Sequence, residues 1–471
     1  MYGEDTLYLP VRELAAGIRA GRLSPVELTR SYLDRLERLG PKLGALVTLM
    51  RDQALAEARQ AEAEIRAGRT RGPLHGVPYG AKDLLATKGV PTTWGAAPYR
   101  DQVFDYDATV IRKLREAGAI LIAKLAMVEI AGGMGYDEPT ASFTGPGRSP
   151  WNPEYWSGGS SSGSAAAVAA ALVAFAIGSE TSGSIMTPAA YSGVTGLRPT
   201  YGRVSLYGAM TLCWTLDKLG PMCRTADDCG LVLAAIAGAD PLDPAAVSRP
   251  YETPPRPELR PPFRLGVLTG SRENPQPEVK QNFEAALEVL RRFATIEEDV
   301  TLPDLPYGAA VGTIVDAEGA SAHEELIESG KVQQLTAPGS RTGAYSGMVT
   351  LAKDYLKAMR MRVQMMRDFD AIFSKYDAVL SPTRATVASP IGVKFRDAYP
   401  GASLSASAAA MIPAANLTGL PGLALPNGFG QNGLPTSIML TGRAWEENRL
   451  IAVAAAYQRE TDWHTKRPVL V

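Results

Sequence analysis

The serines most able to do chemistry lie in the stretch from residue 157 to residue 205. They recur in two glycine-rich turns, residues 158–164 and 178–184, on either side of a wholly apolar run at residues 165–177. Glycines beside serines let the backbone approach a ligand closely and leave N–H groups free to bind an anion. The apolar run must be buried, so a flexible tether is excluded. The stretch predicts a turn, a buried helix and a short strand that carry hydroxyl groups to the edge of a core.

A lysine, Lys82, ends a short apolar strand that follows a turn rich in proline and glycine at residues 72–80. Lysine is seldom fully buried without a partner, and burial lowers its pKa toward neutrality. A neutral lysine can accept the proton of a serine, as histidine does in hydrolase triads. Lys82 is therefore a candidate base. A lysine extending from the strand end into solvent is the alternative.

A second hypothesis makes Ser161 the nucleophile, because residues 159–163 fit the G-x-S-x-G pattern of a nucleophile elbow. That mechanism needs an acid and a histidine further along the chain. The chain has three histidines: His75, His323 and His464. His323 lies in a polar helical context and His464 near the last residue, and neither belongs to a glycine-rich catalytic turn. The lysine-driven mechanism is therefore favoured.

Several motifs together resemble the amidase signature family. They are residues 76–83 (GVPYGAKD), 158–161 (GGSS), 183–185 (GSI), 188–190 (PAA), 196–200 (GLRPT), 380–383 (LSPT) and 416–421 (NLTGLP). The resemblance implies one α/β domain over residues 1–471, with a mixed central β-sheet covered by helices on both faces. Its parts would be an N-terminal helical part (1–70), a catalytic core (71–230) and the rest of the sheet and pocket (263–471). It also implies hydrolysis of an amide C–N bond.

The resemblance implies a catalytic triad as well. Ser184 matches the nucleophile that forms an acyl-enzyme, Ser160 the bridging serine and Lys82 the base. In the family the bridging serine follows a cis peptide bond, here Gly159–Ser160. Lys82 would accept a proton from Ser160, which in turn would deprotonate Ser184.

The turn before the nucleophile is expected to form the oxyanion hole from backbone N–H groups, where one donor contributes roughly 3–4 kcal/mol to lowering the barrier. Those groups belong to Thr181, Ser182, Gly183 and Ser184. Ser182 stands where the family has glycine, and Met186 where it often has arginine. We infer from Met186 an apolar environment and neutral, apolar amide substrates. Esters, aryl amides and carbamates are alternative substrates.

The alternative function is the glutaminase-type A subunit of a tRNA-dependent amidotransferase, which shares the signature. Glutamine is zwitterionic, so its site should present charged groups, and Met186 counts against that. By resemblance alone, Gly132, Gly133 and Met134 are candidate substrate-binding residues.

Composition narrows the kinds of partner and cofactor that the chain is expected to bind. The 471 residues carry a net charge of -1, with 45% hydrophobic and 21% charged residues, so a sizeable core is expected. The near-neutral charge argues against nucleic acid or a membrane as the main partner. We expect a small-molecule amide as the partner, without nucleic acid or membrane, and leave a homodimer open. We expect no cofactor and no metal, because the spacing of Cys213, Cys223 and Cys229 fits no common zinc pattern. The absence of a secretory leader predicts the cytoplasm.

The elements that must position these residues alternate between strands and helices, which predicts a mainly parallel sheet. Helices are expected within residues 9–70, with Ser24 as a cap, and a proline-rich linker at 240–262. Further helices are expected at 108–117, 229–239, 278–293, 343–375 (one helix or a pair) and 446–456. Strands are expected before Lys82 and at 119–124, 263–268, 376–383, 422–425 and 437–440.

Overall fold

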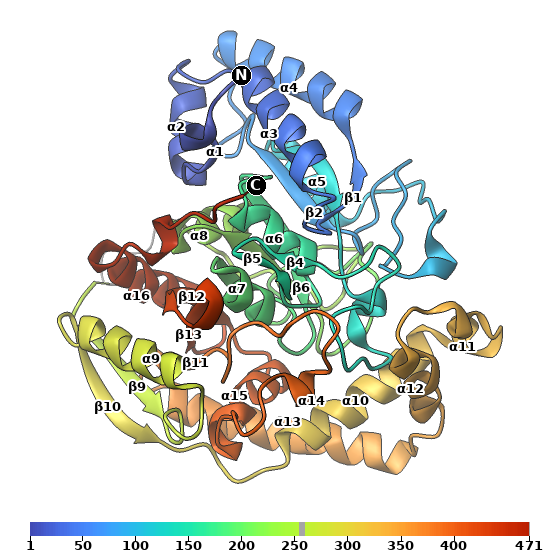
Figure 1. Ribbon diagram of the computed structural model, residues 1–471, viewed down its shortest axis with the longest axis vertical. Coiled ribbons are helices and arrows are strands. Elements are labelled where there is room, and N and C mark those ends of the chain that lie inside the picture. Colours follow the sequence, from blue (N-terminus) through green and yellow to red (C-terminus); the bar gives the residue numbers. More distant parts are fainter. Residues whose placement is uncertain (254–259, 471) are drawn as a thin grey trace.

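A mixed sheet of 11 strands runs through the computed structural model, which describes residues 1–253 and 260–470 (Figure 1). The strand order is β1-β3-β2-β6-β8-β7-β12-β13-β11-β9-β10. These strands are β1 (Leu46–Leu49), β2 (Pro78–Lys82), β3 (Ile120–Leu125), β6 (Phe175–Glu180), β7 (Thr195–Arg198), β8 (Lys218–Cys223), β9 (Phe263–Leu268), β10 (Ala294–Val300), β11 (Ala378–Pro382), β12 (Gly422–Phe429) and β13 (Pro435–Thr441). A separate ribbon pairs β4 (Arg148–Ser149) with β5 (Asn152–Trp156).

The prediction of a mixed sheet is confirmed, but the expectation that it is mainly parallel is wrong. Parallel pairing is limited to β3-β2-β6 on one side and β11-β9-β10 on the other. The strands between β6 and β11 pair antiparallel. Antiparallel neighbours can be joined by a short loop, as β12 and β13 are, whereas parallel ones need a crossover.

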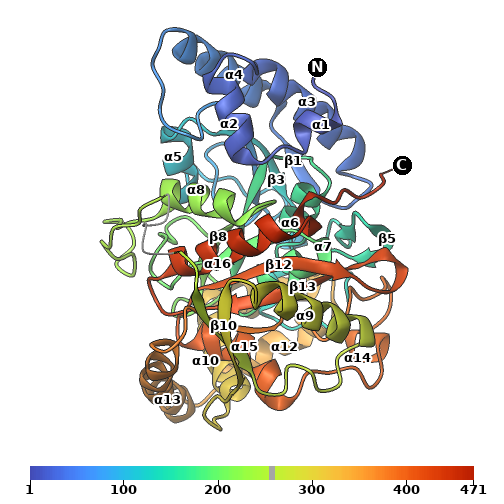
Figure 2. The same ribbon diagram turned by 90° about the vertical axis from the view of Figure 1, so that its left-hand side faces the viewer.

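Helices flank this sheet on both faces, and in Figure 2 α9 (Pro277–Leu290) and α16 (Glu447–Glu460) lie in front of it. The N-terminal helices gather at one end of the molecule (Figure 1): α1 (Glu4–Leu7), α2 (Val11–Arg19), α3 (Pro25–Leu39) and α4 (Arg51–Arg66). Ser24 caps α3 as predicted, since its hydroxyl accepts the N–H of Glu27 at 3.2 Å. None of the described helices combines the length and apolarity needed to cross a bilayer.

The remaining helices include α5 (Thr109–Glu116), α6 (Ser162–Ala169), α7 (Met186–Ser192), α8 (Ala226–Ile236), α10 (Tyr307–Ala322), α11 (Glu324–Glu328), α12 (Pro338–Met348), α13 (Ala352–Phe373), α14 (Phe395–Ala398) and α15 (Ala406–Leu417). The long helical segment predicted at 343–375 is a pair, α12 and α13, separated at residues 349–351. The predicted linker has neither helix nor strand in its described part, and its residues 254–259 lie outside the described residues.

The serine-rich stretch folds as its pattern predicts, into a turn, the buried helix α6 and the buried strand β6. The apolar run is divided between the two, because the chain reverses at Ala171, which has φ +52°. Strand β6 pairs with β2, so the ends of both strands, with Lys82 and Glu180, reach the same edge of the sheet. Strands from the parts 71–230 and 263–471 meet where β7 pairs with β12.

Candidate active site

Lys82 lies at the end of β2 with its side chain fully buried, so the alternative of a solvent-exposed lysine is wrong. Its Nζ lies within hydrogen-bond distance of three hydroxyl oxygens: Ser160 at 2.7 Å, Ser161 at 3.0 Å and Ser179 at 2.8 Å. A buried amine surrounded by neutral hydroxyls has no adjacent carboxylate to stabilise its charge.

Burial lowers the pKa of Lys82 to about 7, although the more distant carboxylates of Asp217 and Glu180 act in the opposite direction. Desolvation disfavours the charged form of an amine, and this explains the direction of the shift. A large fraction of Lys82 is therefore neutral near pH 7, which is the state that can accept a proton.

Ser160 follows a cis peptide bond, Gly159–Ser160, as the resemblance implied. Its side chain is buried, and its carbonyl oxygen accepts the N–H of Val128 at 3.0 Å. Gly159 has no room for a side chain, because a Cβ would lie 2.6 Å from the ring of Trp156. The turn that presents Ser160 is therefore closely packed.

Ser184 joins this cluster from the start of the segment leading into α7. The backbone connects the two turns, since the carbonyl oxygen of Ser184 accepts the N–H of Ser161 at 3.3 Å. The side chain of Ser184 lines a cavity and its residue is 8% exposed. No hydrogen bond joins the hydroxyls of Ser160 and Ser184 among the described contacts.

The start of α7, directly after Ser184, is held by the carboxylate of Glu180. Its Oε2 accepts the N–H groups of Ile185 at 2.8 Å and Met186 at 2.9 Å. Its Oε1 lies 2.6 Å from Arg198 Nη1 and accepts a hydrogen bond from Asn416 at 2.8 Å. Burial alone would raise the pKa of Glu180, but the ion pair with Arg198 and these hydrogen bonds lower it to about 2. Glu180 is therefore ionised over the whole functional pH range.

The candidate oxyanion hole is open to a ligand. The backbone N–H groups of Ser182, Gly183 and Ser184 donate to no acceptor among the described hydrogen bonds. The left-handed backbone of the turn falls at Gly183, with φ +90°, and not at Ser182. The family's glycine at position 182 is thus replaced without backbone strain, and the Ser182 side chain is exposed.

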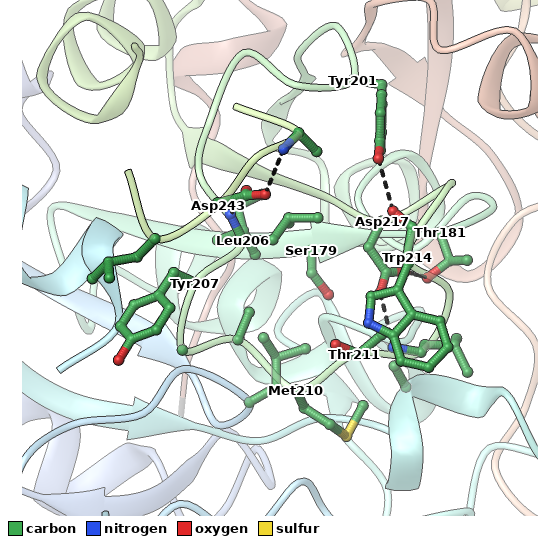
Figure 3. A pocket seen from close by; sticks show the side chains of 18 of the residues that line it. Ser179, Thr181, Tyr201, Leu206, Tyr207, Met210, Thr211, Trp214, Asp217 and Asp243 are labelled. Atoms are coloured by element: carbon green, nitrogen blue, oxygen red, sulfur yellow. Dashed lines mark hydrogen bonds between the residues drawn. The ribbon is translucent and has the colours of Figure 1, made fainter. Parts of the chain in front are cut away.

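A smaller cavity of about 430 Å³ lies behind the cluster, and Ser179, Thr181 and Asp217 are among its lining residues (Figure 3). Asp217 accepts hydrogen bonds from the Thr181 hydroxyl at 2.5 Å and from the N–H of Leu212 at 2.8 Å. Burial raises the pKa of Asp217. These contacts hold Thr181, at the beginning of the turn that leads to Ser184.

Ser184 and Ser182 open onto a larger cavity of about 800 Å³, lined partly by α10 and α15. Aromatic side chains contribute much of its wall: Tyr136, Trp156, Tyr191, Phe395 and Tyr399. Arg384 lines it as well, and no Asp or Glu is among the described lining residues. Met186 is fully buried in α7 and does not line this cavity, so it does not set the polarity of the wall.

The candidate substrate-binding residues Gly132, Gly133 and Met134 line neither of these two cavities. Their neighbours do, since Ala131 lines the smaller cavity and Tyr136 the larger. Along the chain, the three residues therefore lie between one residue of each cavity wall. Their role in substrate binding stays a prediction.

The nucleophile-elbow hypothesis finds no histidine beside Ser161 among the described contacts. The Ser161 hydroxyl contacts Lys82 and donates to the carbonyl oxygen of Ser179 at 3.1 Å. The described contacts of His323 and His75 lie elsewhere, against Trp94 and Glu64 respectively. All three cysteines are buried and free, and no group of three or more His, Cys, Asp or Glu in the described chain could hold a metal ion.

Sequence reasoning missed most of the support around the triad. Ser179 and Ser161 share Lys82 with Ser160, and Arg198 neutralises Glu180. Lys218 was also missed. It is buried on β8 directly opposite Glu180, and burial lowers its pKa to about 7. The signals that could have found them are the serine-rich turns, which contain Ser161 and Ser179, and the charge of Arg198 inside the apolar motif at 196–200.

Comparisons with known proteins identify the family. The Amidase family model matches residues 27–451. A glutamyl-tRNA(Gln) amidotransferase subunit from Moorella thermoacetica is 38% identical, over 99% of each chain. The peptide amidase of Stenotrophomonas maltophilia superposes with a TM-score of 0.86 at 32% identity, over 98% of each chain. The corresponding amidotransferase subunit from Thermotoga maritima superposes with a TM-score of 0.77 at 28% identity, over 97% of this chain and 95% of that one.

These relatives correct the expectation about partners. A small amide as the sole partner, with no nucleic acid, is wrong, because the Moorella and Thermotoga proteins are named as subunits of an enzyme whose substrate is a tRNA. Net charge does not decide this question, since a subunit of such an enzyme need not carry the basic surface itself.

The buried lysine and the paired serine turns lie within residues 27–451, which the family model matches. The chain belongs to the amidase signature family of enzymes that act on C–N bonds.

Proposed function

We propose that this chain hydrolyses the C–N bond of an amide through an acyl-enzyme on Ser184, with Ser160 as proton relay and Lys82 as base. The observation that carries the proposal is the buried Lys82 Nζ, 2.7 Å from Ser160 Oγ and with its pKa lowered to about 7. A general base works best when its pKa lies near the working pH.

In this mechanism the Ser184 oxygen bonds to the amide carbon while its proton passes to Ser160, and the Ser160 proton passes to Lys82. The negative charge that develops on the carbonyl oxygen is stabilised by the N–H groups of the turn that ends at Ser184. The C–N bond then breaks, and the leaving nitrogen takes a proton back along the same path. Water repeats the sequence on the ester and releases the acid.

We further propose that the amide is a primary one and that the chain supplies the released ammonia as the glutaminase-type component of an amidotransferase. The support is the relative from Moorella, which is named as part of such an enzyme and is 38% identical over 99% of each chain. The argument from Met186 against this function loses weight, because that residue does not line the larger cavity.

A second candidate is an amidase that releases the acid as its own product. The cavity wall favours it, because no Asp or Glu among the described lining residues could pair with the ammonium group of glutamine. The closer superposition on the peptide amidase than on the Thermotoga protein points the same way.

One pair of assays tests both candidate functions. Ammonia release from primary amides should occur with the wild-type chain and be lost in Ser184→Ala. This chain should then replace its Moorella counterpart in a reconstituted amidotransferase and support amidation of glutamyl-tRNA(Gln). Hydrolysis without transfer would favour the second candidate, and no hydrolysis of any primary amide would overturn the proposal.

A further inference from the structure

Arg384 is the one lysine or arginine among the described residues that line the larger cavity. It lies two residues after the end of β11, immediately after the motif at residues 380–383, and shares the cavity with Ser184. The residue is exposed, although the groups around its guanidinium partly desolvate it. The guanidinium therefore faces the volume in which a substrate bound at Ser184 would lie.

The neighbours of Arg384 leave its charge uncompensated. Its electrostatic partners are the phenols of Tyr191 and Tyr136, which raise its pKa against the opposing effect of burial. The Tyr191 hydroxyl lies 3.4 Å from Thr386 Oγ1. No Asp or Glu of the described chain forms an ion pair with Arg384, whereas Arg396 on the adjacent helix α14 has Asp397 at 3.6 Å.

A concave wall that carries one cation and no acid selects the charge of its ligand. Guanidinium binds a carboxylate through two parallel hydrogen bonds, which gives both affinity and orientation. A free ammonium group on the ligand would be repelled by Arg384 and would find no carboxylate on the described wall. The aromatic side chains can pack against the apolar part of a ligand between its two ends.

We propose that Arg384 binds a carboxylate of the substrate, so that the substrate is an amide that carries a carboxylate and no free ammonium group. ω-Amides of dicarboxylic acids and amides of N-acylated amino acids belong to this class. The inference rests on the proposed hydrolysis at Ser184 and on the second candidate function, an amidase that releases the acid, because glutamine carries a free ammonium group. It replaces the expectation of a neutral, apolar substrate. It makes Arg384 a specificity-determining residue.

The test uses ω-monoamides of dicarboxylic acids with four to eight carbons, each beside the amide that lacks the carboxylate. The five-carbon member, glutaramate, is also compared with glutamine, which differs by one ammonium group. Initial rates of ammonia release give kcat and KM for wild type, Arg384→Gln and Arg384→Lys. Arg396→Gln is the matched control, since it removes an exposed arginine from a segment beside the cavity.

At least one monoamide should have a higher kcat/KM than its neutral partner, and glutaramate should exceed glutamine. Arg384→Gln should raise KM for the preferred monoamide about 10- to 100-fold, with little change for neutral amides. Arg384→Lys should recover part of the loss, and Arg396→Gln should behave as wild type. Equal effects of Arg384→Gln on charged and neutral amides, or preference for glutamine, would overturn the inference while hydrolysis itself stood. Loss of all hydrolysis in wild type would instead defeat the proposed function.

Discussion

Lys82 is the residue on which the proposed chemistry depends most. Its neutral form must accept a proton, and its pKa is lowered to about 7 by burial. We therefore expect kcat/KM to fall about tenfold for each pH unit below 7 and to level off above it. A pH profile from 5 to 9 measures this. An acid limb that persists unchanged in an active Lys82 variant would contradict the assignment.

Lys218 provides the matched control for that prediction, because it is also buried and also has a pKa lowered to about 7. Its Nζ donates to the carbonyl oxygen of Leu216 and to no serine among the described contacts. Lys82→Ala should reduce kcat by about 10³-fold or more, as expected for loss of a triad base. Lys218→Met should keep the acid limb near pH 7. The reverse pattern would make Lys218 the base.

Glu180 should contribute strongly to stability. Its pKa in the folded protein, about 2, lies below the usual 4.5, so its contribution is present above about pH 4.5 and lost as the pH falls toward 2. Glu180→Gln leaves Arg198 buried without its partner and should lower the unfolding free energy at pH 7 by about 3–5 kcal/mol.

Urea unfolding of Glu180→Gln at pH 7 and pH 3 checks this, with the exposed Glu13→Gln as control. The difference in unfolding free energy between Glu180→Gln and wild type should be smaller at pH 3 than at pH 7. A loss that is the same at both values would show that the carboxylate charge does not matter.

At the scale of elements, the turn between β6 and α7 must combine a left-handed residue with free N–H groups. Gly183 has φ +90°, and a Cβ there would lie 3.3 Å from Thr187 Oγ1. Gly183→Ala should cost about 1–3 kcal/mol in stability and should lower kcat by about 10-fold or more by displacing N–H donors, as oxyanion-hole variants do.

The control for that variant is Gly21→Ala, which has a similar φ of +70° with nothing within 4 Å of the added Cβ. Thermal melts and kcat measured together separate the two effects. Equal losses of stability with unchanged kcat in both variants would argue against a catalytic role for the turn.

The elements also show what could be predicted from the sequence. The apolar run and the serine turns predicted α6 and β6, and the short apolar strand before Lys82 predicted β2, because these signals are local. The grouping of Ser160 and Ser184 with Lys82 was implied by the family resemblance. The partners of Glu180 could not be predicted, since Asn416 comes from a helix 236 residues away in sequence. The antiparallel centre of the sheet was missed because strand order depends on long-range packing, which alternation of elements does not encode. For the same reason Arg384 gave no signal of a role in the cavity.

For the whole molecule, the continuous sheet makes a prediction about unfolding. Strands from residues 71–230 form one side of a single hydrogen-bonded ladder and strands from residues 263–471 the other, joined where β7 pairs with β12. The buried ion pair of Arg203 with Glu447, at 2.9 Å, also joins the core part to α16. We expect one cooperative transition, in keeping with a single domain over residues 1–471. Calorimetry with circular dichroism measures it. Two separated transitions would divide the chain near the linker at 240–262.

The most direct test of the proposed chemistry is labelling with a serine-directed fluorophosphonate, followed by peptide mass mapping, in wild type, Lys82→Ala and Lys218→Met. The mechanism predicts a label on Ser184 that forms much more slowly in Lys82→Ala and normally in Lys218→Met. A label on Ser161 that forms equally well without Lys82 would contradict it.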